Sequence, residues 1–159
     1  MRIISLLCVA LLIVSSCQES ESIDLAEEFL GITETLNDPT PIGAIDSNDW
    51  KPLFYCPPQD TAPPSVLPTC TKAYPVYPNP ASGSCRFDFT VSQSDSIIIT
   101  LFDRPNHPVS TIANRRFAAG AYSYTISLSG LQYTIHRLYF AVVRTTGTHV
   151  TYGDIQVIP

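Results

Sequence analysis

The residues of this chain best suited to covalent chemistry are its five cysteines, Cys8, Cys17, Cys56, Cys70 and Cys85. The chain has no Cys-x-x-Cys pair or His-x3-His spacing, so neither a zinc site nor any other metal site is predicted. In an exported protein, a disulfide is expected. We favour Cys56 with Cys70, since this pair closes a short loop containing Pro-Pro and would stabilise the fold by about 3 kcal/mol.

Cys70 with Cys85 is the alternative disulfide, and it leaves Cys56 unpaired. Cys85 has a second interpretation. It shares strand parity with Phe87 and Phe89, so it could equally be a buried apolar thiol.

Three histidines, His107, His136 and His149, are the other candidate chemical groups. Carboxylates and serines are available to them, but the chain has no Gly-x-Ser-x-Gly elbow, phosphate-binding glycine loop or His-Glu-x-x-His helix. We therefore predict no catalytic residue, no enzymatic activity and no cofactor. A hydrolase is kept as a third class of function, and it would require a pocket that gathers a histidine and a carboxylate.

The first sixteen residues have the pattern of a secretory signal. Arg2 is followed by an apolar run from Ile3 to Val14, which is too short to span a bilayer as a helix. Val14-Ser15-Ser16-Cys17 resembles the lipobox of bacterial lipoproteins, which implies that residues 1–16 are removed and that Cys17 is acylated. Several acyl chains together give stable membrane anchoring. The alternative is an ordinary signal peptide with an incidental cysteine.

An acidic tract, Gln18 to Ser22, follows Cys17. It resembles the export signals that direct some Gram-negative lipoproteins to the outer face of the outer membrane, and the alternative is a solvated spacer. We expect an outer-membrane lipid anchor, with the chain at the cell surface if this signal operates. If Cys17 is not lipidated, we expect a secreted protein.

Residues 17–36 are interpreted as a lipidated acidic tether that contains a short amphipathic helix. The residues Ile23, Ala26, Phe29 and Leu30 recur near a 3.6-residue period. Residues 37–73 are rich in proline and are predicted to be an extended, semi-rigid linker. Three aromatic residues in this linker, Trp50, Phe54 and Tyr55, are expected to fold one side of it onto the following domain.

Charge is divided unevenly along the chain, whose net charge is −5. Residues 18–60 carry ten acids against Lys51 alone, whereas residues 71–159 carry seven bases against four acids. These bases are scattered, so no nucleic-acid partner is predicted. The acidic tether suits a chain held away from an anionic membrane surface.

Residues 74–159 alternate between apolar and polar side chains and are predicted to be all-β. We expect strands over 85–91, 97–102, 109–113, 121–128, 138–144 and 149–158, with turns between them. Cys85, Phe87, Phe89 and Val91 share one face of the first strand. Short strands at this spacing predict a Greek-key β-sandwich of immunoglobulin type.

Several short motifs in this half resemble the C-terminal sorting domain of type IX secretion cargo and the immunoglobulin-like domain of the flagellar hook-capping protein. The matching residues are Tyr77-Pro78-Asn79-Pro80, Phe102-Asp103, Gly120-Ala121-Tyr122, Tyr139-Phe140 and Ile155 to Ile158. The resemblance covers residues 74–159. Asn106 or Pro105 stands where the family commonly has a turn glycine, and Asn106 can adopt the required left-handed conformation.

The sequence therefore predicts a non-enzymatic, membrane-anchored lipoprotein. It would display an immunoglobulin-like β-sandwich to a protein partner, which would be a secretion or envelope component or an external surface. The alternative is a secreted cargo whose C-terminal sorting domain is recognised by the type IX machinery.

Overall fold

The computed structural model describes residues 29, 31–54, 68–132 and 134–159. The predicted signal peptide, the predicted lipidation site Cys17, Tyr55 and the predicted disulfide partner Cys56 lie outside these residues. Within them, no helix is long and apolar enough to cross a membrane. The strands of this part of the chain are β1 (Lys72–Ala73), β2 (Ser84–Val91), β3 (Asp95–Arg104), β4 (His107–Phe117), β5 (Gly120–Ser127), β6 (Ile135–Arg144) and β7 (Gly147–Gln156).

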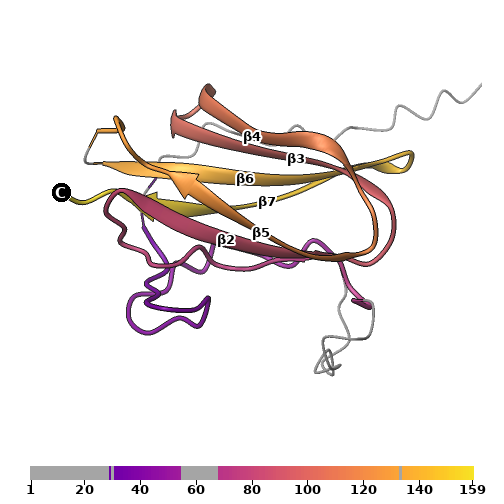
Figure 1. The fold of residues 1–159 in the computed structure, drawn as a ribbon, viewed down its shortest axis with the longest axis horizontal. Coiled ribbons are helices and arrows are strands. Elements are labelled where there is room, and N and C mark those ends of the chain that lie inside the picture. Colours follow the sequence, from indigo (N-terminus) through magenta and orange to yellow (C-terminus); the bar gives the residue numbers. More distant parts are fainter. Residues whose placement is uncertain (1–28, 30, 55–67, 133) are drawn as a thin grey trace, which may run out of the picture.

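The strands form two antiparallel sheets that pack face to face as a β-sandwich (Figure 1). One sheet has the order β1-β2-β5, and the other has the order β4-β3-β6-β7. β1 pairs with β2 through Lys72 and Ala73, so strand pairing begins before the predicted domain start at residue 74. The prediction of an all-β chain half is confirmed.

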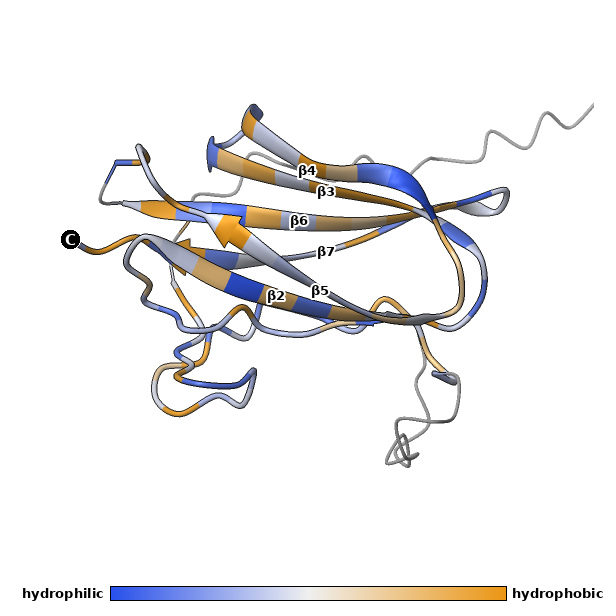
Figure 2. Ribbon diagram, in the orientation of Figure 1, coloured by the Kyte–Doolittle hydropathy of each residue, from blue (hydrophilic) through white to orange (hydrophobic). Residues whose placement is uncertain are grey.

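Period-two alternation explains why these segments form strands. In β2 the residues Cys85, Phe87, Phe89 and Val91 are buried, while Arg86 is exposed. Figure 2 shows this alternation as bands of opposite hydropathy along β2. Alternating side chains point to opposite faces of a sheet, so one face of β2 supplies the core and the other meets solvent.

The hairpin between β3 and β4 is longer than the sequence predicted. Turn residues between 103 and 108 were expected to separate two short strands, but pairing extends to Arg104 and His107. Pro105 and Asn106 alone make the turn. Asn106 adopts a φ of 61°, the left-handed conformation expected for it, because asparagine tolerates this region better than most residues.

The core lies between the two sheets and is rich in aromatic side chains. Phe89 of β2 packs against Phe140 of β6 with ring centroids 5.1 Å apart and against Phe117 of β4 at 5.4 Å. Tyr122 of β5 lies 5.3 Å from Phe89. These contacts join strands of both sheets, so burial of the aromatic face holds the sandwich together.

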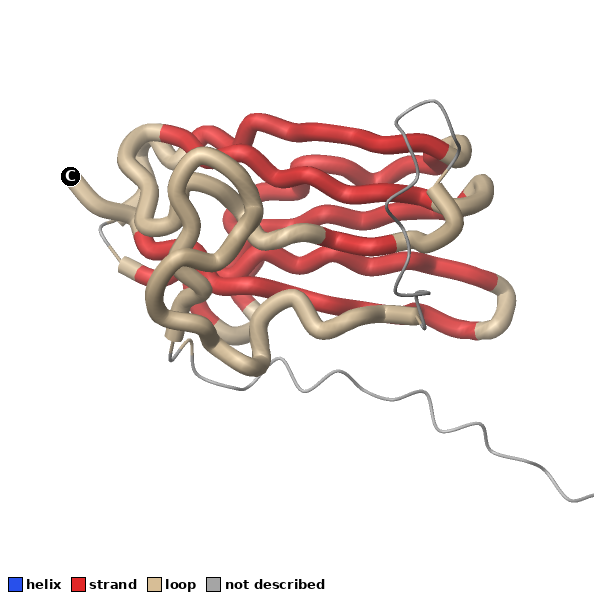
Figure 3. The backbone as a smooth tube through the Cα atoms, turned by 90° about the horizontal axis from the view of Figure 1, so that it is seen from below, coloured by secondary structure: helices blue, strands red, loops and turns tan. Residues whose placement is uncertain are grey.

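Most of the predicted short helix, including Ile23, Ala26 and Leu30, lies outside the described residues, and residues 31–36 that follow it are not helical. Residues 31–34 have no regular secondary structure, residue 36 lies in a bend, and Thr35 forms bridges with Pro41 and Asn79. Figure 3 shows strands and loops, and no helix, in the described part of the chain. Thr33 and Thr35 are both buried, so burial repeats every second residue, as in a strand. Both are β-branched, and β-branched residues favour extended backbone.

The first part of the predicted linker is packed onto the sandwich. Residues 31–54, which we call the N-terminal segment, fold back so that Trp50 enters the core and lies 5.3 Å from Phe87. Phe54 lies 4.7 Å from the ring of His149. The contacts of Trp50 and Phe54 confirm that aromatic residues attach this region to the domain. Residues 50–54 are therefore part of the folded domain and not of a separate linker.

Candidate functional site

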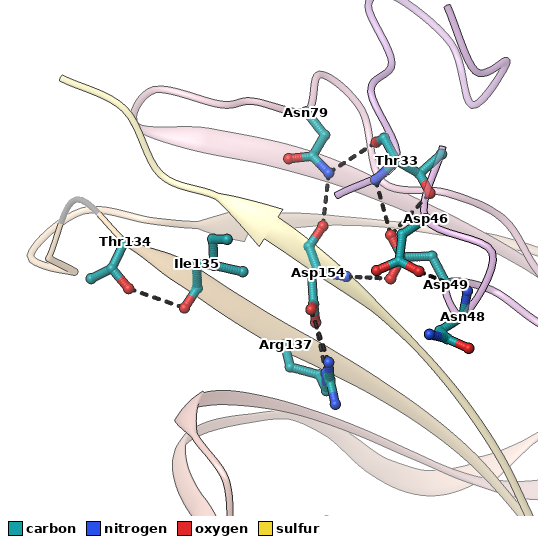
Figure 4. A network of polar contacts seen from close by, with 9 residues as sticks. All are labelled: Thr33, Asp46, Asn48, Asp49, Asn79, Thr134, Ile135, Arg137 and Asp154. Carbon is teal, nitrogen blue, oxygen red and sulfur yellow. Dashed lines mark hydrogen bonds and ion pairs between the residues drawn. The ribbon is translucent and has the colours of Figure 1, made fainter. Parts of the chain in front are cut away.

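The N-terminal segment is joined to β7 by a buried polar network, which we call the junction and define by Thr33, Asp49, Asn79, Arg137 and Asp154 (Figure 4). Asn79 is fully buried at its centre. Its amide nitrogen donates to the carbonyls of Thr33 at 3.0 Å and Asp154 at 2.8 Å. Its amide oxygen accepts from the N–H of Gln156 at 2.9 Å.

The backbone of Asn79 adds two hydrogen bonds to the same segment. Thr35 N–H donates to the Asn79 carbonyl at 2.9 Å, and Asn79 N–H donates to the Thr35 carbonyl at 3.2 Å. The peptide bonds before Pro78 and Pro80 are cis. The motif residue Asn79 therefore connects the N-terminal segment to the last strand, and its polar groups are satisfied inside the protein.

Tyr77 makes a separate contact at the surface of the three-stranded sheet. Its hydroxyl donates to a carboxylate oxygen of Asp88 at 2.6 Å, and the Nε of Arg86 donates to the other oxygen at 3.1 Å. Burial, followed by the hydrogen bond to Asp88, raises the pKa of Tyr77. The tyrosine is thus held in its neutral, hydrogen-bond-donating form.

Asp49 supplies the acidic group of the junction. One carboxylate oxygen accepts from both the N–H and the hydroxyl of Thr33 at 2.9 Å, and the other accepts from the N–H of Asp154 at 3.0 Å. The side chain of Asp154 turns the other way and makes a two-point ion pair with Arg137, with N–O distances of 2.7 and 2.9 Å.

The Arg137–Asp154 pair is almost completely removed from solvent, with side-chain exposures of 4% and 0%. The guanidinium also lies over the rings of Tyr152 at 4.2 Å and Phe29 at 4.4 Å. Burial acts to lower the pKa of Arg137, but the hydrogen bonds to Asp154 outweigh it and raise that pKa. A buried, paired and stacked arginine of this kind is costly to disturb, because loss of one partner leaves an uncompensated charge.

Asp49 gives the junction a dependence on pH. Burial raises the pKa of its carboxyl to about 7, although the hydrogen bonds from Thr33 act to lower it, and the charge of Asp154 adds to the rise. The folded state therefore binds more protons than the unfolded state between pH values of about 4 and 7. We expect the contribution of Asp49 to stability to fall as the pH rises through this window.

Urea unfolding at pH 5 and pH 8 measures this dependence. The wild-type chain should lose more stability between these values than Asp49→Asn, which cannot titrate. The two proteins are compared by their change in stability with pH and not by their absolute stability. The asparagine side chain of Asp49→Asn also replaces one of the oxygens that accept from Thr33 and Asp154, which lowers stability at every pH. Equal changes in the two proteins would refute the assignment, and the histidines, present in both, cancel from the difference.

Trp50 reaches the core at the same edge. The backbone N–H of Trp50 donates to the Tyr152 carbonyl at 2.6 Å, and the φ angle of Trp50 is 54°. The indole occupies the space that a Cβ at Gly153 would need. Its Nε1 has no hydrogen-bond partner among the described residues, and neither does the Thr151 hydroxyl. Packing rather than polar contact therefore holds this side chain.

Gly120, Tyr122 and Tyr139 of the predicted sorting motif do not contribute to the junction, whereas the N–H of Gln156, in the matching segment 155–158, bonds to Asn79. Gly120 and Tyr122 belong to β5, and the Tyr122 hydroxyl donates to the Ala118 carbonyl at 2.9 Å. Tyr139 of β6 packs 4.9 Å from Phe102 and 5.7 Å from Tyr152, measured between ring centroids. Tyr122 also packs across the sandwich, 4.9 Å from the ring of Phe117 in β4, so these residues serve packing rather than the junction.

The histidines lie apart from one another. His107 contacts the carboxylate of Asp103 at 2.6 Å on the exposed β3–β4 hairpin. His136 is buried beside the Thr134 carbonyl, and His149 packs on Phe54. Among the described residues, no group of three histidine, cysteine, aspartate or glutamate side chains could hold a metal ion.

Cys85 is a buried free thiol, so the alternative disulfide between Cys70 and Cys85 is wrong. Burial raises the pKa of Cys85 to about 12. The interpretation of Cys85 as an apolar core residue is confirmed by its exposure of 3%. The pairing of Cys70 with Cys56 stays a prediction.

Of the junction, sequence reasoning singled out only Asn79. Thr33, Asp49, Arg137 and Asp154 carry no local motif, and the isolated apolar Trp50 near Asp49 was the one available signal. No protein-family model matches this chain, and neither a curated protein nor a solved structure matches it.

Proposed function

We propose that this protein is a non-enzymatic lipoprotein, anchored in the outer membrane through acyl chains on Cys17, that displays a β-sandwich for contact with a protein partner. The partner would be a component of an envelope or secretion assembly, or an external surface. The observation that carries the proposal is the sequence Val14-Ser15-Ser16-Cys17 at the end of a short apolar run, followed by an acidic tract.

We further propose that the sandwich is a Greek-key domain of immunoglobulin type. Support comes from the strand order, in which β1-β2-β5 faces β4-β3-β6-β7. Seven-stranded immunoglobulin sandwiches likewise divide their strands between two antiparallel sheets. Such folds serve many functions, so the fold alone does not identify the partner.

The junction limits how far the sandwich would stand from the lipid. Phe29 is the first described residue, its ring contacts the Arg137 guanidinium, and it stands twelve positions after Cys17 in the sequence. An extended chain of this length spans at most about 40 Å. The display proposal therefore places the sandwich close to the membrane rather than at the end of a long stalk.

A second candidate is a secreted cargo with a C-terminal sorting domain, and the observation that favours it is the motif from Tyr77 to Pro80. The environment of Asn79 offers another explanation of the same residues. Its side chain is satisfied by Thr33, Asp154 and Gln156, and it is buried away from any receptor.

Metabolic labelling with an alkyne analogue of palmitate separates the two candidates. Full-length protein expressed in a Gram-negative host should be labelled and should partition with membranes, and Cys17→Ser should be unlabelled. Cys8→Ser, which changes a cysteine of the signal, is the matched control and should leave labelling intact. Label that persists in Cys17→Ser, or unlabelled wild-type protein in the medium, would refute the lipoprotein proposal, and the second result supports the secreted cargo.

A further inference from the structure

The outer edge of β4 is regular over only half of its length. The pairing of β3 with β4 shifts register between Ile99 and Thr100 and twice more between Leu101 and Arg104, so the half of β4 from His107 to Ile112 is bulged. From Ala113 to Phe117 each residue pairs in step with β3. Bulges make a strand edge a poor template for another chain, whereas a regular edge presents an evenly spaced row of N–H and C=O groups.

The other edge of the same sheet is already occupied. Trp50 N–H bonds to the Tyr152 carbonyl of β7, and Ala81 N–H bonds to the Gln156 carbonyl. Asp49 and Asn79 accept from the N–H groups of Asp154 and Gln156. By contrast, among the described residues, the backbone of residues 113–117 makes hydrogen bonds only to β3.

Two arginines mark the regular half of β4. Arg115 donates to the Tyr124 hydroxyl at 3.0 Å and lies over the ring of Phe117 at 4.5 Å. Arg116 donates from Nε to the Ser94 hydroxyl at 2.9 Å. Both side chains are exposed, and within the described part of the chain no carboxylate pairs with either. Figure 2 shows this end of β4 as hydrophilic.

Arg116 also lines a cleft of about 520 Å³ at the end of the sheet. The one acid of that cleft, Asp95, is buried and already bound at two points by Arg144, with N–O distances of 3.0 and 2.5 Å. The remaining lining is mainly hydroxyl and amide groups from Gln93, Ser94, Ser96, Thr145 and Thr146. The lining of the cleft therefore carries a net charge of one positive, which is the charge of Arg116.

We propose that residues Ala113 to Phe117 of β4 bind an extended acidic peptide segment of a partner protein as an added strand, with one of its carboxylates held by Arg116 at the mouth of the cleft. This inference rests on the proposed contact function and names the surface and the chemistry of the partner. Backbone pairing would supply affinity, and the two arginines would supply the preference for acidic side chains.

The same charges disfavour other occupants of this edge. In an antiparallel pair of two β4 strands centred on residue 115, the two Arg115 side chains would lie directly opposite, and like charges in that position are destabilising. A basic strand would meet the same repulsion. The neighbouring edge of β5 carries no charged side chain, so it offers no such preference.

Fluorescence anisotropy with the purified full chain tests the proposal. The probe is a labelled, capped six-residue peptide of alternating valine and glutamate, and the comparison peptide replaces glutamate with lysine. We expect binding of the glutamate peptide alone, weakened about tenfold or more between 50 and 500 mM salt, because exposed charges are screened. Equal binding of the two peptides, or no binding at millimolar concentration, would overturn the proposal.

Two substitutions of equal charge locate the site. Arg116→Glu should weaken binding about tenfold or more, whereas Arg104→Glu, at the opposite end of β3, should change it by less than about twofold. Amide hydrogen exchange of the wild-type chain gives a readout independent of any variant, with added protection expected at 113–117. Protection on β5 instead, or equal losses in the two variants, would refute the site. Lipid labelling at Cys17 is independent of peptide binding, so failure of one proposal is distinguishable from failure of the other.

Discussion

Gly153→Ala is expected to destabilise the protein by about 2–5 kcal/mol, a large effect for the addition of one methyl group. A Cβ at residue 153 would lie 1.9 Å from Cε2 and 2.1 Å from Nε1 of Trp50. The indole is enclosed between β7 and Phe87, so it cannot move aside without leaving the core. The strand and the N-terminal segment would therefore have to separate.

Urea unfolding, followed by circular dichroism because two of the variants lack the only tryptophan, measures this effect. Gly120→Ala is the matched control, because its Cβ would meet Tyr122 no closer than 3.5 Å, an ordinary contact. Trp50→Ala alone should cost about 3–5 kcal/mol. In that background Gly153→Ala should cost little, a non-additivity expected of residues in contact. A loss in Gly153→Ala no larger than in Gly120→Ala would contradict the packing described for Trp50.

Asn79→Ala is expected to cost at least about 3 kcal/mol, because it leaves three polar groups without their partner at about 1–3 kcal/mol for each buried group. These groups are the carbonyls of Thr33 and Asp154 and the N–H of Gln156. The loss should appear as a lower midpoint of urea unfolding.

Asn37→Ala is the control for Asn79→Ala, since Asn37 is exposed on the same N-terminal segment. It should change the midpoint little. If Asn79→Ala were as stable as this control, the junction would not hold the segment to β7, and the motif would need an explanation outside the fold.

The strands were predictable because their signal is local. β2 and β5 begin and end within a residue or so of the segments expected from alternation, since neighbouring side chains reveal which face is buried. β4 was predicted too short. Its exposed residues after Ala113 do not alternate in hydropathy, and pairing with β3 rather than burial extends the strand to Phe117.

The junction was not predictable because its partners are far apart in the chain. Asn79 bonds to groups 46 and 75 residues away, and Asp49 bonds to the N–H of Asp154, 105 residues away. No window of sequence contains such a pair. The same distance explains why the bridge between Thr35 and Asn79 was not predicted.

The buried thiol of Cys85 has a consequence for experiments on intact cells. Thiolate is the reactive form, and burial both hides this sulfur and raises its pKa to about 12, so an alkylating reagent cannot modify it while the sandwich is closed. Modification would require the strands around β2 to come apart. The rate at which a maleimide attaches to Cys85 therefore reports how often the native protein opens, with no engineered label.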